Sequence, residues 1–133
     1  MPSTIEIAVT SDKDVVLARQ QGRALAAELG FSASDATLIA TAISELSRNI
    51  VTYARTGVVV LRRVSGPRGS GLTIEAVDRG PGIVDIERAV RDGYSSSGGL
   101  GLGLPGVRRL MDEFQINSSV GDGTSVVVTK WLK

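Results

Sequence analysis

Cysteine and histidine are both absent from the 133 residues of this chain. Without cysteine, disulfides and thiolate metal sites are excluded. Without histidine, the chain lacks the most common general base and metal ligand, and it cannot carry a phosphohistidine. Aromatic residues make up only 4% of the sequence and hydrophobic residues 42%. A core must therefore be built mainly from Val, Ile, Leu and Ala.

A strong charge of one sign and a long apolar run are also missing. The chain has 15 basic and 14 acidic residues, for a net charge of +1. This balance gives no general reason to expect nucleic acid or an anionic membrane as a partner. No apolar run approaches the roughly 20 residues of a membrane span, and residues 1–4 do not resemble the start of a signal peptide. We therefore expect a single cytoplasmic domain covering residues 1–133.

Hydrophobic periodicity predicts an alternation of strands and helices along the chain. Strands are expected at residues 5–9, 58–64, 72–77, 115–120 and 124–131. Helices are expected at residues 12–29, from Ser32 or Ser34 to about residue 54, at 85–91 and at 105–114. Gly30 and Gly57 are expected to end the first two helices. This order predicts an α+β two-layer sandwich, with helices covering one face of a mostly antiparallel sheet.

The second predicted helix carries a polar stripe at helical spacing, made by Thr41, Glu45, Arg48, Asn49 and Thr52. A solvated helix face explains such a stripe equally well. An asparagine in mid-helix is unfavourable, however, and usually has a specific role. A carboxylate can accept a proton, and an amide oxygen one turn further on can ligate a hard cation such as Mg²⁺.

A turn with the sequence Asp-Arg-Gly-Pro-Gly follows the strand predicted at residues 72–77. Asp and Gly are ordinary turn residues, so a purely structural role is a sufficient explanation. In a functional role, the Asp78 carboxylate would accept a hydrogen bond from an adenine amino group. Gly80 and Gly82 would then allow the backbone to approach a flat ring closely.

A glycine-rich segment at residues 98–103 leads into the helix expected from Pro105. Free N–H groups and the dipole of a helix N-terminus favour a phosphate there, although a flexible linker is the simpler alternative. The segment also matches the dinucleotide fingerprint Gly101-x-Gly103-x-x-Gly106, but a serine-rich loop precedes it instead of a strand. A P-loop and a conventional protein kinase are excluded because their signatures are missing.

The order and spacing of these motifs resemble those of the GHKL superfamily, which includes gyrase, Hsp90 chaperones, histidine kinases and MutL. Residues 45–49 resemble its N box, 78–82 its G1 box and 99–103 its G2 region. More narrowly, the chain resembles the anti-sigma-factor serine/threonine kinases, and among them the RsbT-type stressosome switch kinases. The segments that carry this resemblance are 41–50, 97–107, 109–114 and 130–132. The resemblance implies the Bergerat ATP-binding fold.

The resemblance also implies roles for individual residues, with ATP and Mg²⁺ as cofactors. Glu45 would be the general base that acts on the acceptor hydroxyl, and Asn49 would hold Mg²⁺ against the phosphates. Asp78 would bind the adenine amino group, with Thr124 supporting it directly or through water. Gly80 and Gly82 would lie beside the adenine ring. The segment that covers the phosphates would contain Gly99, Gly101 and Gly103.

By the same resemblance, the partners would be STAS-domain scaffold proteins of the RsbR and RsbS type. The kinase released from them would activate an RsbU-type phosphatase. Without histidine the chain cannot be a self-phosphorylating histidine kinase, and Glu45 favours transfer to a Ser or Thr on another protein. Two alternatives remain, a nucleotide-gated anti-sigma-like adaptor and a histidine kinase fragment or weak ATPase. Arg19 and Arg23, one turn apart, are either solvated or directed at a partner acid.

Overall fold

The computed structural model describes residues 4–80 and 103–132 and contains one five-stranded sheet. The strand order is β1-β2-β3-β5-β4, and every neighbouring pair is antiparallel. The strands are β1 (Thr4–Val9), β2 (Gly57–Gly66), β3 (Gly69–Asp78), β4 (Glu113–Ser119) and β5 (Gly123–Trp131). The helices are α1 (Asp12–Leu29), α2 (Ala33–Asn49), the π-helix η1 (Ile50–Ala54) and α4 (Gly103–Leu110).

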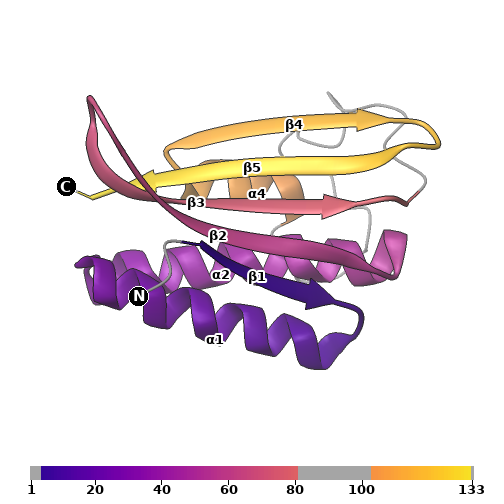
Figure 1. Cartoon of the computed structure of the whole chain (residues 1–133), viewed down its shortest axis with the longest axis horizontal. Helices are drawn as coiled ribbons and strands as arrows, with labels where there is room; N and C mark the ends of the chain where they lie inside the picture. The colour runs from indigo at the N-terminus through magenta and orange to yellow at the C-terminus, as the bar shows by residue number, and fades with distance from the viewer. Residues whose placement is uncertain (1–3, 81–102, 133) are drawn as a thin grey trace.

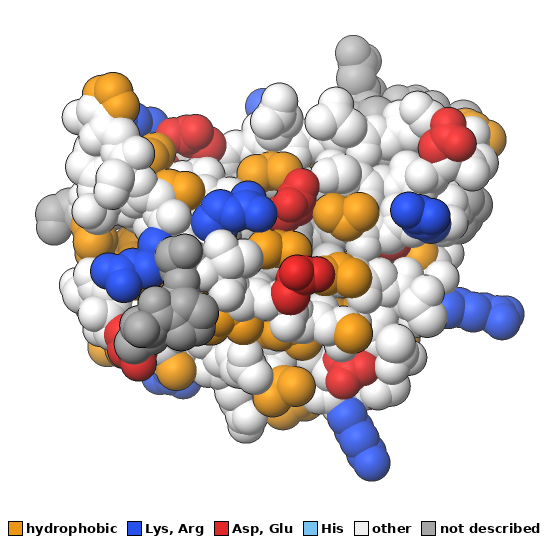
Figure 2. Space-filling view, viewed as in Figure 1, with side chains coloured by type: hydrophobic (Ala, Val, Ile, Leu, Met, Phe, Trp, Pro, Cys, Tyr) orange, Lys and Arg blue, Asp and Glu red, His pale blue; other side chains and the backbone are white. Residues whose placement is uncertain are grey.

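The helices cover one face of this sheet, as predicted, and Figure 1 shows α2 and α4 behind the strands. Side chains alternate between the two faces of a strand, and one set is buried in the core. This set includes Val59 and Leu61 of β2, Leu72 and Ile74 of β3, and Val126 and Val128 of β5. They share the core with Ile39, Ile43 and Leu46 of α2. The face turned to the viewer in Figure 2 mixes hydrophobic, acidic and basic side chains.

The boundaries of α1 and the start of α2 agree with the sequence prediction. Gly30 follows α1 with a φ of 101°, a left-handed conformation that suits glycine, and its N–H bonds back to the carbonyl groups of Ala26 and Ala27. Ser32 caps α2, because its Oγ accepts a hydrogen bond from the backbone N–H of Asp35 at 3.0 Å. The serine residue that caps this helix is therefore Ser32 and not Ser34.

The second helical segment ends at Ala54, as predicted, but its last part is not α-helical. The α-helix ends at Asn49 and continues as η1, and Arg55 then takes a φ of 73°. Gly57 does not end the helix but begins β2. A Cβ at Gly57 would lie 2.6 Å from the carbonyl oxygen of Val77 and 2.8 Å from the side chain of Ile50. Glycine is needed there because β3 and η1 approach the backbone closely.

The helix predicted at residues 105–114 is also shorter than expected. It ends at Leu110, and Phe114 lies in β4. The backbone N–H of Asp112 already donates to the carbonyl of Thr129 in β5, at 2.9 Å, so pairing with the sheet replaces helical hydrogen bonds. The connection between the strands predicted at 58–64 and 72–77 is also shorter than expected, because β2 and β3 pair as far as Gly66 and Gly69. The helix predicted at 85–91 lies outside the described residues.

Across residues 4–80 and 103–132, none of the helices has the length and apolar character required to cross a membrane.

Candidate functional site

Glu45 lies on α2 with only 8% of its surface exposed. Its Oε1 accepts a hydrogen bond from Nη1 of Arg48 at 2.9 Å, and its Oε2 accepts one from the backbone N–H of Gly103 at 3.4 Å. A solvated helix face therefore does not describe this position, although Arg48 and Thr52 of the same stripe are exposed. The buried carboxylate of Glu45 therefore contacts Gly103, the first residue of α4.

Asn49 follows Glu45 by one helical turn and is the last residue of α2. It is half-buried, and its side chain does not cap η1. In the described parts of the chain, no group of three or more acidic, histidine or cysteine side chains gathers as a metal site. Mg²⁺ is commonly bound by few protein ligands together with substrate phosphates and water. A single amide oxygen from Asn49 fits that mode of binding.

Asp78 is the last residue of β3, as its sequence context predicted. Its Oδ1 accepts a hydrogen bond from the backbone N–H of Gly80 at 2.9 Å, which orients the half-buried carboxylate. A Cβ at Gly80 would lie 2.7 Å from the Cβ of Ala54. Gly80 is therefore required by the close approach of this turn to the end of η1.

Thr124 of β5 is the cross-strand partner of Asp78. Directly opposed residues present their side chains on the same face of a sheet, so the two predicted site residues are brought together. The Oγ1 of Thr124 shares a hydrogen bond with the Oγ of Ser118 at 2.9 Å. This bond connects the threonine to β4, a link that the sequence analysis did not identify.

Gly123 is a second residue near Asp78 whose importance was not recognised from the sequence. It has a φ of 93°, and a Cβ there would overlap the carbonyl oxygen of Asp78 and lie 2.7 Å from the Cα of Arg79. The available signal was the sequence Gly-Asp-Gly-Thr at residues 121–124, which lies between the strands predicted at 115–120 and 124–131. A hairpin turn was sufficient to explain it. Together with Gly57 and Gly80, it allows three neighbouring segments to approach the end of β3.

The remaining predicted residues fall into three groups. Gly103 begins α4 with a φ of 64° and contacts Glu45 through its N–H. Gly82, Gly99 and Gly101 lie outside the described residues. Arg19 and Arg23 are both exposed on α1, and contact with a partner stays a prediction for them.

Comparison with known proteins identifies relatives over nearly the whole chain. The model of the histidine kinase-like ATPase domain matches residues 8–130. The serine/threonine-protein kinase RsbT of Bacillus subtilis (strain 168) is 51% identical over 127 residues, which cover 96% of each chain. The anti-sigma F factor of Thermoanaerobacter sp. (strain X514) is 31% identical over 121 residues, covering 86% of this chain and 83% of the relative.

Solved structures support the fold at lower identity. The RsbU and RsbW domains of Rv1364c from Mycobacterium tuberculosis match with a TM-score of 0.67 and 24% identity, over 98% of this chain and 32% of that one. The mycobacterial sensor histidine kinase MprB matches with a TM-score of 0.56 and 16% identity, over 98% and 97% of the two chains. Both comparisons confirm the α+β ATPase architecture that the sequence predicted.

The sequence relatives also confirm the predicted resemblance to GHKL-type anti-sigma-factor kinases and to the RsbT type among them. The chain thus belongs to the histidine kinase-like ATPase domain family, within which its relatives include a serine/threonine-protein kinase and anti-sigma factors.

Proposed function

We propose that this chain is an ATP- and Mg²⁺-dependent protein serine/threonine kinase that phosphorylates a STAS-domain partner. The relative that is 51% identical over 96% of each chain supports the enzyme class, and the match to an ATPase domain supports the use of ATP. The observation that carries the proposal is the position of Glu45, a buried carboxylate next to the N-terminal residue of α4.

The nucleotide would lie across the ends of β3, α2 and α4. Asp78, held by the N–H of Gly80, would accept a hydrogen bond from the adenine amino group. The N-terminus of α4 would face the phosphates. Although the N–H of Gly103 donates to Glu45, the following turn and the helix dipole still favour an anion at this end. Asn49 would hold Mg²⁺, which neutralises negative charge on the phosphates.

Glu45 would act as the general base in the transfer. Its carboxylate would accept the proton of the acceptor Ser or Thr hydroxyl while that oxygen forms a bond to the γ-phosphorus and the bond to ADP breaks. Arg48 and the N–H of Gly103 each engage one oxygen of this carboxylate. Because an ionised carboxylate has about four lone-pair sites, it can still accept the hydroxyl proton.

The proposed acceptors are scaffold proteins of the RsbR and RsbS type, followed by activation of an RsbU-type phosphatase when the kinase is released. The relative named RsbT supports a role in this kind of regulation. Since ATP is made and kept in the cytoplasm, the proposed reaction also implies a cytoplasmic location.

A second candidate function is a nucleotide-gated adaptor with little transfer, supported by the 31% identical anti-sigma F factor. Glu45 favours the kinase, because binding alone does not require a base. Incubation of the protein with ATP labelled at the γ-phosphate and a purified STAS domain distinguishes the two functions. Label on a Ser or Thr of the STAS domain supports the kinase, whereas a stoichiometric complex without label supports the adaptor.

A further inference from the structure

Lys130 is a buried cation near the end of β5, at the opposite end of the strand from Thr124. It lies on β5 opposite Leu72, on the side of the strand that also carries Val126 and Val128, and only 7% of its surface is exposed. Its Nζ donates a hydrogen bond to the carbonyl oxygen of Leu110 at 2.9 Å. Lysine is rarely buried unless its charge is compensated, so this contact requires an explanation.

The acceptor of this hydrogen bond is the last residue of α4. The final carbonyl groups of a helix have no partner within the helix, and they form the negative end of its dipole. A buried ammonium at that position satisfies a carbonyl and complements the dipole. Lys130 therefore stabilises the C-terminal end of α4.

The two ends of α4 are thus held by groups of opposite charge. Gly103 at the first residue donates to the Glu45 carboxylate, and Leu110 at the last accepts from Lys130. With eight residues, α4 is only about 12 Å long. In so short a helix, a shift at the C-terminal end also moves the N–H groups at the N-terminal end.

We propose that Lys130 is a positioning residue for nucleotide phosphates, acting through α4. By fixing the C-terminal end of α4, it sets the direction of the N–H groups that face the phosphates. This inference rests on the proposed function, in which ATP binds at that helix end. Because Lys130 would act through the helix end that faces the phosphates, its effect should be specific to ligands that carry phosphates.

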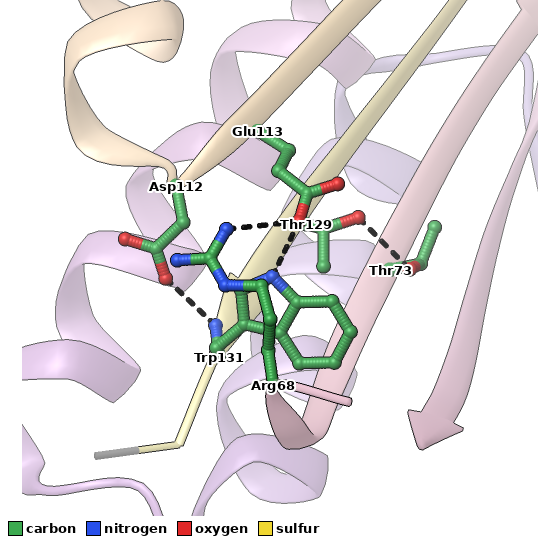
Figure 3. Close-up of polar contacts among 6 residues, drawn as sticks. All are labelled: Arg68, Thr73, Asp112, Glu113, Thr129 and Trp131. Atoms are coloured by element: carbon green, nitrogen blue, oxygen red, sulfur yellow. Dashed lines mark hydrogen bonds and ion pairs between the residues drawn. The ribbon is translucent and has the colours of Figure 1, made fainter. Parts of the chain in front are cut away.

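The neighbouring residue Trp131 provides a matched control. It points to the other face of β5, where its Nε1 donates to Glu113 and its ring lies 5.7 Å from the guanidinium carbon of Arg68 (Figure 3). Its backbone N–H donates to Asp112 at 2.8 Å, a contact that any residue except proline retains. Trp131→Phe therefore alters the same strand end without removing the bond from Lys130 to Leu110.

The test measures binding of Mg·ATP and of adenosine by calorimetry, using wild-type protein and the variants Lys130→Met, Lys130→Arg and Trp131→Phe. Met keeps the apolar stem of the side chain but removes the donor, and Arg keeps a donor. We expect Lys130→Met to weaken ATP binding about tenfold, the effect of losing one charge-assisted hydrogen bond. Adenosine binding should stay unchanged, Lys130→Arg should restore most of the ATP affinity, and Trp131→Phe should match wild type.

Equal ATP affinity in wild type and Lys130→Met would overturn the inference, and so would an equal loss of ATP and adenosine binding. If Lys130→Met does not fold, Lys130→Gln replaces it in the test. Glutamine keeps a neutral donor, so we expect an ATP affinity between that of Lys130→Arg and the tenfold loss expected for Lys130→Met. Wild-type ATP affinity in Lys130→Gln would also overturn the inference. A wild-type protein that binds ATP no more tightly than adenosine would instead contradict the proposed function itself.

Discussion

Glu45 and Gly103 are 58 positions apart in the sequence, yet the carboxylate of the first accepts a hydrogen bond from the N–H of the second at 3.4 Å. This contact joins the C-terminal half of α2 to the first residue of α4. It connects the residue proposed as the base to the helix end proposed to bind phosphates.

Asn49→Ala should abolish Mg·ATP-dependent phosphorylation of a STAS domain and leave the fold intact. Removal of the amide oxygen removes the proposed protein ligand of Mg²⁺, and we expect transfer to fall on the order of 100-fold or more. Label transfer measures the effect, and circular dichroism checks the fold. Thr52→Ala, an exposed position on the same stripe, is the control and should transfer normally. Wild-type transfer by Asn49→Ala would show that the metal assignment is wrong.

Asp78→Asn should weaken binding of adenosine as well as of ATP. The amide can present an NH₂ group toward the adenine amino group, where the carboxylate presents only an acceptor. We expect about a tenfold loss, corresponding to one hydrogen bond to a charged group. Calorimetry with both ligands measures the effect. A variant that loses ATP affinity but keeps adenosine affinity would place Asp78 at the phosphates instead.

Gly123→Ala should destabilise the protein more than Gly121→Ala. Both glycines have a positive φ, 93° and 87°, so an alanine at either costs roughly 1–2 kcal/mol in backbone strain. Only at Gly123 would the new Cβ also overlap the backbone of Asp78, which adds about 1–3 kcal/mol of overpacking. Urea unfolding of the two variants measures the difference. Equal stability would mean that β5 does not need to approach Asp78 so closely.

Asp14 should contribute to stability in a pH-dependent manner. Hydrogen bonds from the backbone N–H and then the hydroxyl of Thr10 hold the pKa of the Asp14 carboxyl below its usual value of 3.8. Because the pKa is lowered on folding, this contribution is present above 3.8 and is lost as the pH falls through the folded-state pKa. Urea unfolding should therefore show Asp14→Asn to be less stable than wild type at neutral pH, with the difference shrinking in acid. A difference that is constant with pH would contradict this.

Local patterns were sufficient to predict much of the fold. Apolar spacing and Gly30 located α1, and the alternation of β-branched residues located the strands. The same reasoning failed where tertiary packing overrides a helical pattern. Phe114 continues the apolar spacing of α4, but the backbone of Asp112 is already bonded to Thr129. The helix predicted to about residue 54 does reach Ala54, but its change to a π-helix at Ile50 could not be read from the apolar spacing.

The candidate site was predictable in its residue types more than in its contacts. Asp78 and Thr124 were named from motifs, and the antiparallel register makes them neighbours. The burial of Glu45 could not be read from its stripe, because a charged residue at helical spacing fits solvent equally well. Its contact with Gly103 and the bond from Lys130 to Leu110 depend on how α4 packs, which no local pattern encodes.

The most direct test of the kinase function is the single-turnover rate of phosphate transfer by Glu45→Gln at saturating Mg·ATP. Glutamine keeps the size of the side chain but cannot act as the base. We expect transfer to a STAS domain to slow by about 10²–10⁴-fold, while the affinity for Mg·ATP stays close to that of wild type. Transfer at the wild-type rate by Glu45→Gln would contradict the assignment of Glu45 as the catalytic base.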